Sequence, residues 1–89
     1  MGSRTLRKTS EFLAQAQQAS QNVPRLLEAI GGAEFVLVRT PELGMAVRDS
    51  NLHSWPLHPA PDLTYKVVYS FNDREVVFRA LYSAVAPAG

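Results

Sequence analysis

The chain has 89 residues, of which 46% are hydrophobic and 19% charged, so it can form one packed domain over residues 1–89. It has no cysteine, which excludes a disulfide framework and a thiolate metal site, and two histidines alone cannot build a zinc site. The formal net charge of +1 gives no indication of nucleic-acid binding, because the cations are mostly dispersed. We therefore expect no metal and no cofactor.

Membrane and export signals are missing from the sequence. No stretch approaches the roughly 18 to 20 apolar residues of a membrane span, and the longest apolar run is FVLV at residues 35–38. Residues 1–8 are basic, but no apolar segment follows them, which excludes a secretory signal. We expect a cytoplasmic protein with no membrane partner.

The first part of the chain predicts a strand followed by a helix. Residues 4–8 suit an edge strand or an extended arm. Thr9 and Ser10 offer a hydroxyl that can cap a helix, and the strong helix formers of residues 11–20 place their apolar positions on one face. We predict a short amphipathic helix here.

A second helix is predicted to begin at Val23, with Asn22 as its cap and Pro24 in its first turn. Its apolar stripe is interrupted by glycines at residues 31–32, and two interpretations follow. Either the helix ends there and residues 35–38 form a strand, or it continues to about residue 39, before the next proline. Local propensity favours the strand.

Residues 40–61 contain four prolines and a glycine and predict a loop, with a short strand near residues 52–57. Within this loop, Trp55 is expected to cover the edge of the core. His53 and His58 are expected to be exposed, since nothing in their spacing indicates a catalytic triad.

The clearest signal is a β-hairpin. Residues 63–71 and 75–82 are rich in β-branched and aromatic residues, and the turn-forming residues 72–74 join them. Period-two alternation predicts one large apolar face that needs the helical pair as its cover. That face is predicted to hold Tyr65, Val67, Tyr69, Phe71, Val76, Phe78, Ala80 and Tyr82, with Arg79 and Leu81 on the opposite face.

The predicted order of elements, a strand, two helices, a loop and a hairpin, resembles that of the RelE/ParE superfamily of toxins from type II toxin–antitoxin systems. Several segments of the sequence carry this resemblance. They are LLEAI at residues 26–30, RTPELG at residues 39–44, YKVVY at residues 65–69 and EVVFRALYSA at residues 75–84. The resemblance implies an α+β fold of order β-α-α-β-β-β, in which a helical hairpin packs on a small antiparallel sheet. It also implies that the second helix continues through residues 35–38.

The resemblance further implies a candidate catalytic set. A ribonuclease of this superfamily needs cations to hold the scissile phosphate and groups that move protons. Lys66, Arg79 and Tyr82 are the residues that fit, with Lys66 where the family more often has arginine. Family members often carry histidine or arginine just after the last strand, whereas residues 82–87 here offer only a tyrosine and a serine. Cations on a solvated sheet face are more often ordinary surface charges, and a tyrosine at a strand end usually packs its ring and leaves its hydroxyl in water.

As to function, the resemblance implies a toxin that a cognate antitoxin neutralises. RelE-like members cleave messenger RNA on the ribosome and ParE-like members inhibit DNA gyrase, and the PELG turn and missing histidine favour the ParE side. The alternative is a non-toxic interaction module, and a homodimer remains open. Leu13, Val23 and Leu27 are predicted to form the surface on which an antitoxin helix docks.

Overall fold

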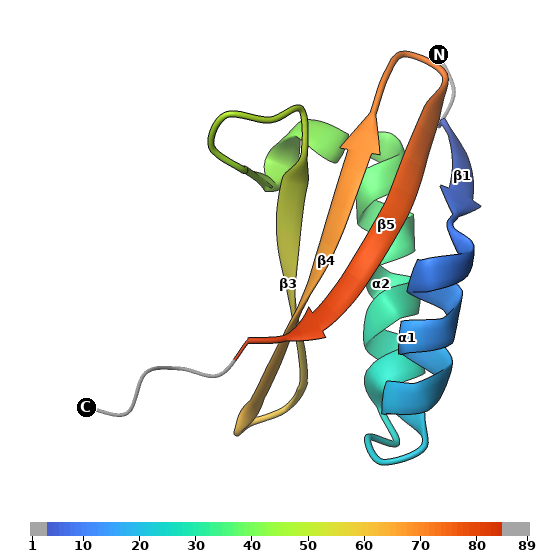
Figure 1. Cartoon of the computed structure of the whole chain (residues 1–89), viewed down its shortest axis with the longest axis vertical. Coiled ribbons are helices and arrows are strands. Elements are labelled where there is room, and N and C mark those ends of the chain that lie inside the picture. Colours follow the sequence, from blue (N-terminus) through green and yellow to red (C-terminus); the bar gives the residue numbers. More distant parts are fainter. Residues whose placement is uncertain (1–3, 85–89) are drawn as a thin grey trace.

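The computed structural model describes residues 4–84, and in these the α+β class and the predicted order of elements are confirmed. Two helices lie on the same side of one sheet (Figure 1). The elements are β1 (Thr5–Lys8), α1 (Ser10–Ser20), α2 (Leu26–Arg39), the short 3₁₀ helix η1 (Pro41–Leu43), β2 (Met45–Ala46), β3 (His53–Ala60), β4 (Leu63–Phe71) and β5 (Glu75–Ser83).

The sheet is mixed rather than purely antiparallel as expected. Its strand order is β1-β5-β4-β3-β2, and β1 pairs in parallel with β5, Thr5 lying opposite Glu75, while the other neighbours are antiparallel. The predicted edge strand near the N-terminus is thus confirmed, but its partner is the last strand. Only the tertiary fold brings these two ends of the chain together.

The N-terminus of α1 is fixed by its cap. The hydroxyl of Thr9 accepts a hydrogen bond from the backbone N–H of Phe12 at 3.1 Å and donates one to the carbonyl of Arg79 at 3.0 Å. One side chain therefore satisfies an unpaired N–H of the helix and also ties its start to β5.

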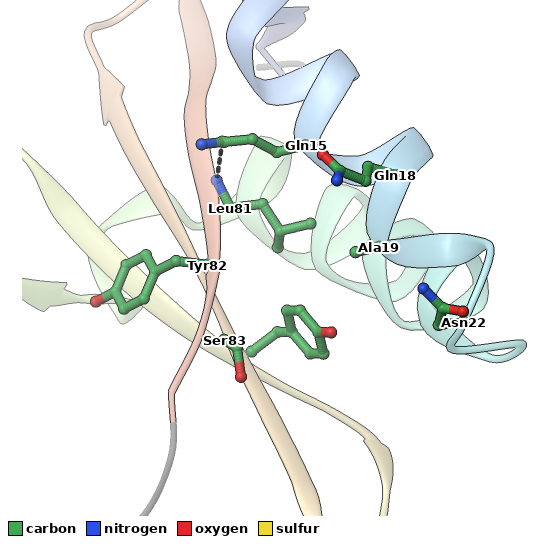
Figure 2. A pocket seen from close by; sticks show the side chains of 8 residues that line it. Gln15, Gln18, Ala19, Asn22, Leu81, Tyr82 and Ser83 are labelled. Carbon is green, nitrogen blue, oxygen red and sulfur yellow. Dashed lines mark hydrogen bonds between the residues drawn. The ribbon is translucent and has the colours of Figure 1, made fainter.

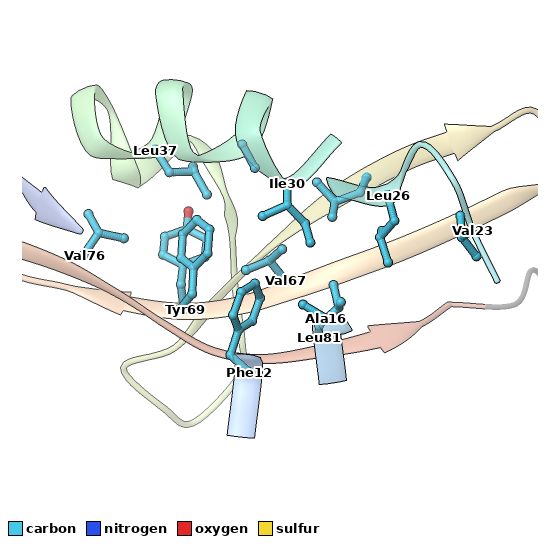
Figure 3. Close-up of a cluster of buried hydrophobic side chains, with 13 residues drawn as sticks. Phe12, Ala16, Val23, Leu26, Ile30, Leu37, Val67, Tyr69, Val76 and Leu81 are labelled. Atoms are coloured by element: carbon cyan, nitrogen blue, oxygen red, sulfur yellow. The ribbon is translucent and has the colours of Figure 1, made fainter. Parts of the chain in front are cut away.

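The second helix begins at Leu26, and the expected start at Val23 is wrong because residues 22–25 form a turn. The helix runs through both glycines to Arg39, so residues 35–38 are helical, as the resemblance implied. Ile30 and Leu37 point into the core (Figure 3), and Ala33 between them is buried too. This packing at helical spacing outweighs the local preference for a strand.

Within the loop expected over residues 40–61, β3 confirms the short strand predicted near residues 52–57 and extends it to eight residues, including Pro56 and Pro59. On its outer edge, β3 pairs with β2 only at His53 and Ser54. The rest of this edge of β3 makes no sheet hydrogen bonds, so proline, which has no N–H to donate, is tolerated there. Trp55 lies in this strand rather than in a loop, although it packs against the core as expected.

A β-bulge reverses the side-chain alternation late in the predicted hairpin. The β4–β5 register shifts between the pair Val68–Ala80 and the pair Tyr69–Phe78, leaving Arg79 as the extra residue. Beyond the bulge, Leu81 is buried in the core and the next residue is exposed. The expectation that Ala80 and Tyr82 share a face with Phe78 is therefore wrong.

The core lies between the helical pair and the sheet (Figure 3). At its centre the rings of Phe12 and Phe78 meet edge to face, with centroids 5.4 Å apart. Val23 belongs to this core, so its expected place on a docking surface is wrong, whereas Leu13 and Leu27 are exposed. Within residues 4–84, no helix is long and apolar enough to cross a membrane.

The two glycines of α2 generate a stability prediction. A Cβ built on Gly31 or Gly32 meets no atom within 4 Å, and alanine is the better helix former. We expect Gly31→Ala and Gly32→Ala each to raise the free energy of unfolding by about 0.5 to 1 kcal/mol in urea denaturation.

The matched control is Gly44→Ala outside the helix. A Cβ at Gly44 collides with the phenol oxygen of Tyr69 and lies 2.7 Å from the carbonyl of Ser54, so this substitution is expected to lower stability. A loss of stability for both helical variants contradicts the assignment of open space above α2.

Candidate functional site

The face of the sheet that the helices leave uncovered carries two of the three predicted catalytic residues side by side. Lys66 on β4 lies directly opposite Tyr82 on β5, and on its other side it lies opposite Pro56 on β3. Lys66 is half-buried and Tyr82 is 46% exposed. The two ion pairs among residues 4–84 do not involve Lys66, so its ammonium is available to an anion.

The third predicted residue, Arg79, is directed elsewhere. As the extra residue of the bulge, it donates a hydrogen bond from Nε to the hydroxyl of Ser70 at 2.8 Å. Ser70 is four residues from Lys66 along β4, which corresponds to about 13 Å in a strand. The structure therefore pairs Lys66 with Tyr82, whereas the Arg79 guanidinium is hydrogen bonded to a residue further along β4.

A hollow of about 430 Å³ opens beside Lys66. Leu43 and Met45 contribute large exposed apolar side chains to it, 56% and 72% exposed respectively. Sequence reasoning missed this hollow, because its walls come from η1, β2, β3 and β4, and only the PELG turn gave any signal. Its other lining residues are Gly44, Ser54, Trp55 and Pro56.

One buried phenol holds η1 and β2 against the sheet. The Tyr69 hydroxyl donates a hydrogen bond to the carbonyl of Pro41 at 2.5 Å and accepts one from the N–H of Gly44 at 3.0 Å. The close approach of this phenol leaves no room for a side chain at residue 44. Tyr69 therefore sets the position of the apolar wall beside Lys66.

The environment of Tyr69 favours the neutral phenol. Burial raises its pKa above the ordinary value of 10.0, and the nearby carboxylate of Glu42 raises it further. The hydrogen bond from Gly44 lowers the pKa, with an effect smaller than that of burial and larger than that of Glu42. The phenol thus acts as a structural hydrogen-bonding group.

Within residues 4–84, neither histidine forms a hydrogen bond with Lys66 or Tyr82. His58 is exposed, as expected, but the same expectation for His53 is wrong, because its half-buried ring packs against Phe71 with centroids 5.0 Å apart. The Nδ1 atom of His53 is buried without a hydrogen-bond partner. Among residues 4–84, no group of three or more His, Asp or Glu side chains is placed to hold a metal ion.

Two helices packed on one face of a five-stranded mixed sheet, in this order of elements, define a RelE/ParE-like fold. Among solved structures, the chain is similar to the crystal structure of YafQ from E. coli strain BL21(DE3), with a TM-score of 0.58 and 12% sequence identity. The likeness covers 90% of this chain and 92% of that chain.

A second similar structure is a YafQ mutant from E. coli in which one histidine is replaced by glutamine. Its TM-score is 0.51 at 11% identity, again over 90% of this chain and 92% of that chain. No protein-family model and no curated protein sequence matches the chain. At these identities the likeness shows the fold, and the fold is the one that the sequence resemblance implied.

The Tyr69 contacts predict the effect of removing one hydroxyl. We expect Tyr69→Phe to lower the free energy of unfolding by about 1 to 3 kcal/mol, because it leaves the buried carbonyl of Pro41 and the N–H of Gly44 without their partner. Urea denaturation measures this loss. Tyr82→Phe, which removes an exposed hydroxyl, is the control and is expected to have little effect.

The raised pKa of Tyr69 also predicts a dependence on alkaline pH. Because the folded pKa lies above the unfolded value of 10.0, the contribution is complete below pH 10.0 and is lost as pH rises from there through the folded pKa. Stability measured across this range should fall more steeply in the wild type than in Tyr69→Phe. Equal slopes in the two proteins contradict the assignment.

Proposed function

We propose that the chain is the toxin of a type II toxin–antitoxin pair and that it acts on RNA through the uncovered face of its sheet. YafQ, whose fold the chain shares, is a RelE-family toxin of such a system. Shared fold alone does not assign function, so the proposal depends on the residues of this face.

The observation that carries the proposal is the pairing of Lys66 with Tyr82. The ammonium of Lys66 suits an RNA phosphate, and the exposed ring of Tyr82 next to it suits stacking of a base or donation of a proton. Arg79, whose guanidinium is bonded to Ser70 further along β4, suits another phosphate of the same strand. Cations at this spacing fit an extended single strand better than one isolated phosphate.

A second candidate function is inhibition by binding alone, as in the ParE-like inhibitors of DNA gyrase or in a non-toxic interaction module. It is favoured by the position of Arg79, whose guanidinium is bonded to Ser70 and not gathered with Lys66 and Tyr82. A phosphodiester that contacts Lys66 and Tyr82 therefore lacks a second cation to stabilise its transition state.

Induced expression in a bacterium separates these functions. Growth, messenger-RNA integrity and plasmid supercoiling are followed together for the wild type, Lys66→Ala and the control Arg74→Ala, which removes an exposed cation of the β4–β5 turn. Growth arrest with RNA cleavage that Lys66→Ala abolishes supports the proposal. Arrest with altered supercoiling and intact RNA supports gyrase inhibition, and normal growth supports the non-toxic module.

Binding in vitro gives a quantitative prediction for Lys66. We expect Lys66→Ala to weaken binding of single-stranded RNA of any sequence and to reduce the slope of log K against log salt concentration by about 0.7, the value for one lost phosphate contact. Arg74→Ala should retain the wild-type slope. An unchanged slope in Lys66→Ala excludes it as a phosphate contact.

A groove between the two helices is proposed as the antitoxin surface. Gln15 of α1 hydrogen bonds to β5, so Leu13, two residues earlier and about 200° around the helix, faces the side of α2. Leu27 lies on the same side of α2 as Glu34, which forms an ion pair with Lys8 just before α1. Both leucines are exposed, 51% and 60%, as docking of an apolar helix requires.

Co-purification with the product of an adjacent gene tests this surface. Leu13→Asp and Leu27→Asp are expected to abolish the complex, because each places a charge in an apolar contact. Leu63→Asp, at an exposed position at the start of β4, is the control and should leave the complex intact. Retention of the complex by both groove variants rules out this surface.

A further inference from the structure

A second hollow, of about 280 Å³, lies on the opposite side of β5 from Lys66, between α1 and the ends of β4 and β5. Its polar groups are the carboxamides of Gln15, Gln18 and Asn22 together with the hydroxyls of Tyr65, Tyr82 and Ser83. No charged side chain lines it. Apart from Tyr82, which also belongs to the candidate active face, these residues are used neither by that face nor by the helical groove.

The three carboxamides form one stripe of the chain. Gln15 and Gln18 lie three residues apart on α1, and Asn22 lies in the turn just after this helix; all three line the hollow beside β5 (Figure 2). The carbonyl oxygen of the Gln15 amide accepts the N–H of Leu81 at 2.8 Å. β1 pairs with β5 only as far as Phe78, so the N–H of Leu81 has no partner on β1 and bonds to Gln15 instead.

The other two carboxamides remain free to bind a ligand. Neither Gln18 nor Asn22 makes a side-chain hydrogen bond to any residue in the described part of the chain, residues 4–84. Each carries an NH₂ donor beside a carbonyl acceptor, so each matches a ligand edge on which an acceptor and a donor are adjacent. The uncharged lining favours a neutral ligand.

The floor of the hollow includes an aromatic ring. Tyr65 lies on the helix-facing side of β4, because it alternates with the adjacent lysine and is in phase with buried Val67. Tyr65 is half-buried, so its ring remains partly open to a ligand. A flat ring beside free carboxamides suits a planar ligand that stacks and hydrogen bonds at its edge.

We propose that this hollow binds an unpaired nucleobase, with adenine preferred, of the RNA strand whose phosphates contact Lys66. This inference rests on the proposed function. A base is neutral and planar, and adenine presents the adjacent donor and acceptor that asparagine and glutamine pair with in a bidentate manner. Bases of single-stranded RNA are commonly bound in this way, splayed out and stacked on an aromatic side chain.

The two surfaces are separated by the width of one strand. Tyr82 lies opposite Lys66 and its ring points away from α1, whereas the neighbouring Leu81 points toward α1 (Figure 2). β1 does not pair with this part of β5, where Gln15 of α1 takes the N–H of Leu81 instead. A strand held by Lys66 can therefore pass round the edge of β5 and place one base in the hollow.

The test compares short oligo(A) and oligo(U) RNAs in equilibrium binding to the full chain. The wild type is expected to prefer oligo(A) by on the order of tenfold, the effect of one bidentate contact. The double variant Gln18→Ala/Asn22→Ala should lose this preference while binding oligo(U) as the wild type does. Gln17→Ala, which removes an exposed carboxamide on another side of α1, should retain the preference.

Titration with adenosine alone separates this inference from the proposed function. In an NMR titration at millimolar concentration, adenosine is expected to shift the side-chain amide signals of Gln18 and Asn22 more than uridine or glucose does. If these shifts occur and RNA does not bind, the hollow is a base site and the proposed function is wrong. If RNA binds through Lys66 without base preference, or glucose shifts these signals more than adenosine, the base site is overturned.

The same spectra control for misfolding of the variants. The backbone amide pattern of Gln18→Ala/Asn22→Ala should match that of the wild type outside α1 and the end of β5, because both side chains are exposed. A preference for oligo(A) that survives in a folded double variant overturns the base site.

Discussion

The single extra residue in β5 is the constraint on which the two surfaces of this sheet depend. Before the bulge at Arg79, Val76 and Phe78 point into the core, and after it Leu81 does so. The reversal places Tyr82 beside Lys66 on the uncovered face. With strict alternation, an exposed leucine would take that position, and neither the cation–phenol pair nor the hollow against α1 would form.

A second constraint connects the core to the rim of the candidate site. Tyr69 has a fully buried ring, yet its hydroxyl bonds to the backbone at both ends of η1, to the first residue Pro41 and to Gly44 just after the last. Because a buried carbonyl or N–H is costly to leave unpaired, this contact fixes the path of the chain. The hydrogen bonds of the Tyr69 hydroxyl therefore hold Leu43 and Met45 beside Lys66, where they line the same hollow.

The surfaces proposed for RNA and for an antitoxin lie on opposite sides of the molecule. Lys66 and Tyr82 are on the open face of the sheet, while Leu13 and Leu27 are on the outer side of the helices. An antitoxin helix in that groove leaves the open face uncovered, so neutralisation through this groove requires a further segment of the partner to reach the sheet. The base hollow lies between these surfaces, at the edge of β5.

Local patterns in the sequence determined much of the fold and part of the site. The cap at Thr9, the helix that follows and the turn at residues 72–74 were predictable, because each depends on residues close in the chain. Family resemblance also suggested Lys66 and Tyr82 as candidates, but not that they lie opposite each other.

Local patterns left the continuation of α2 past its glycines open, and the family resemblance implied it. The tertiary structure alone decided the extension of β3 through Pro59, the bulge and both hollows. Each of these depends on contacts between segments far apart in the chain, such as the phenol of Tyr69 with the carbonyl of Pro41. Such contacts outweigh local propensity because burial and paired hydrogen bonds stabilise more than the backbone preference of one residue.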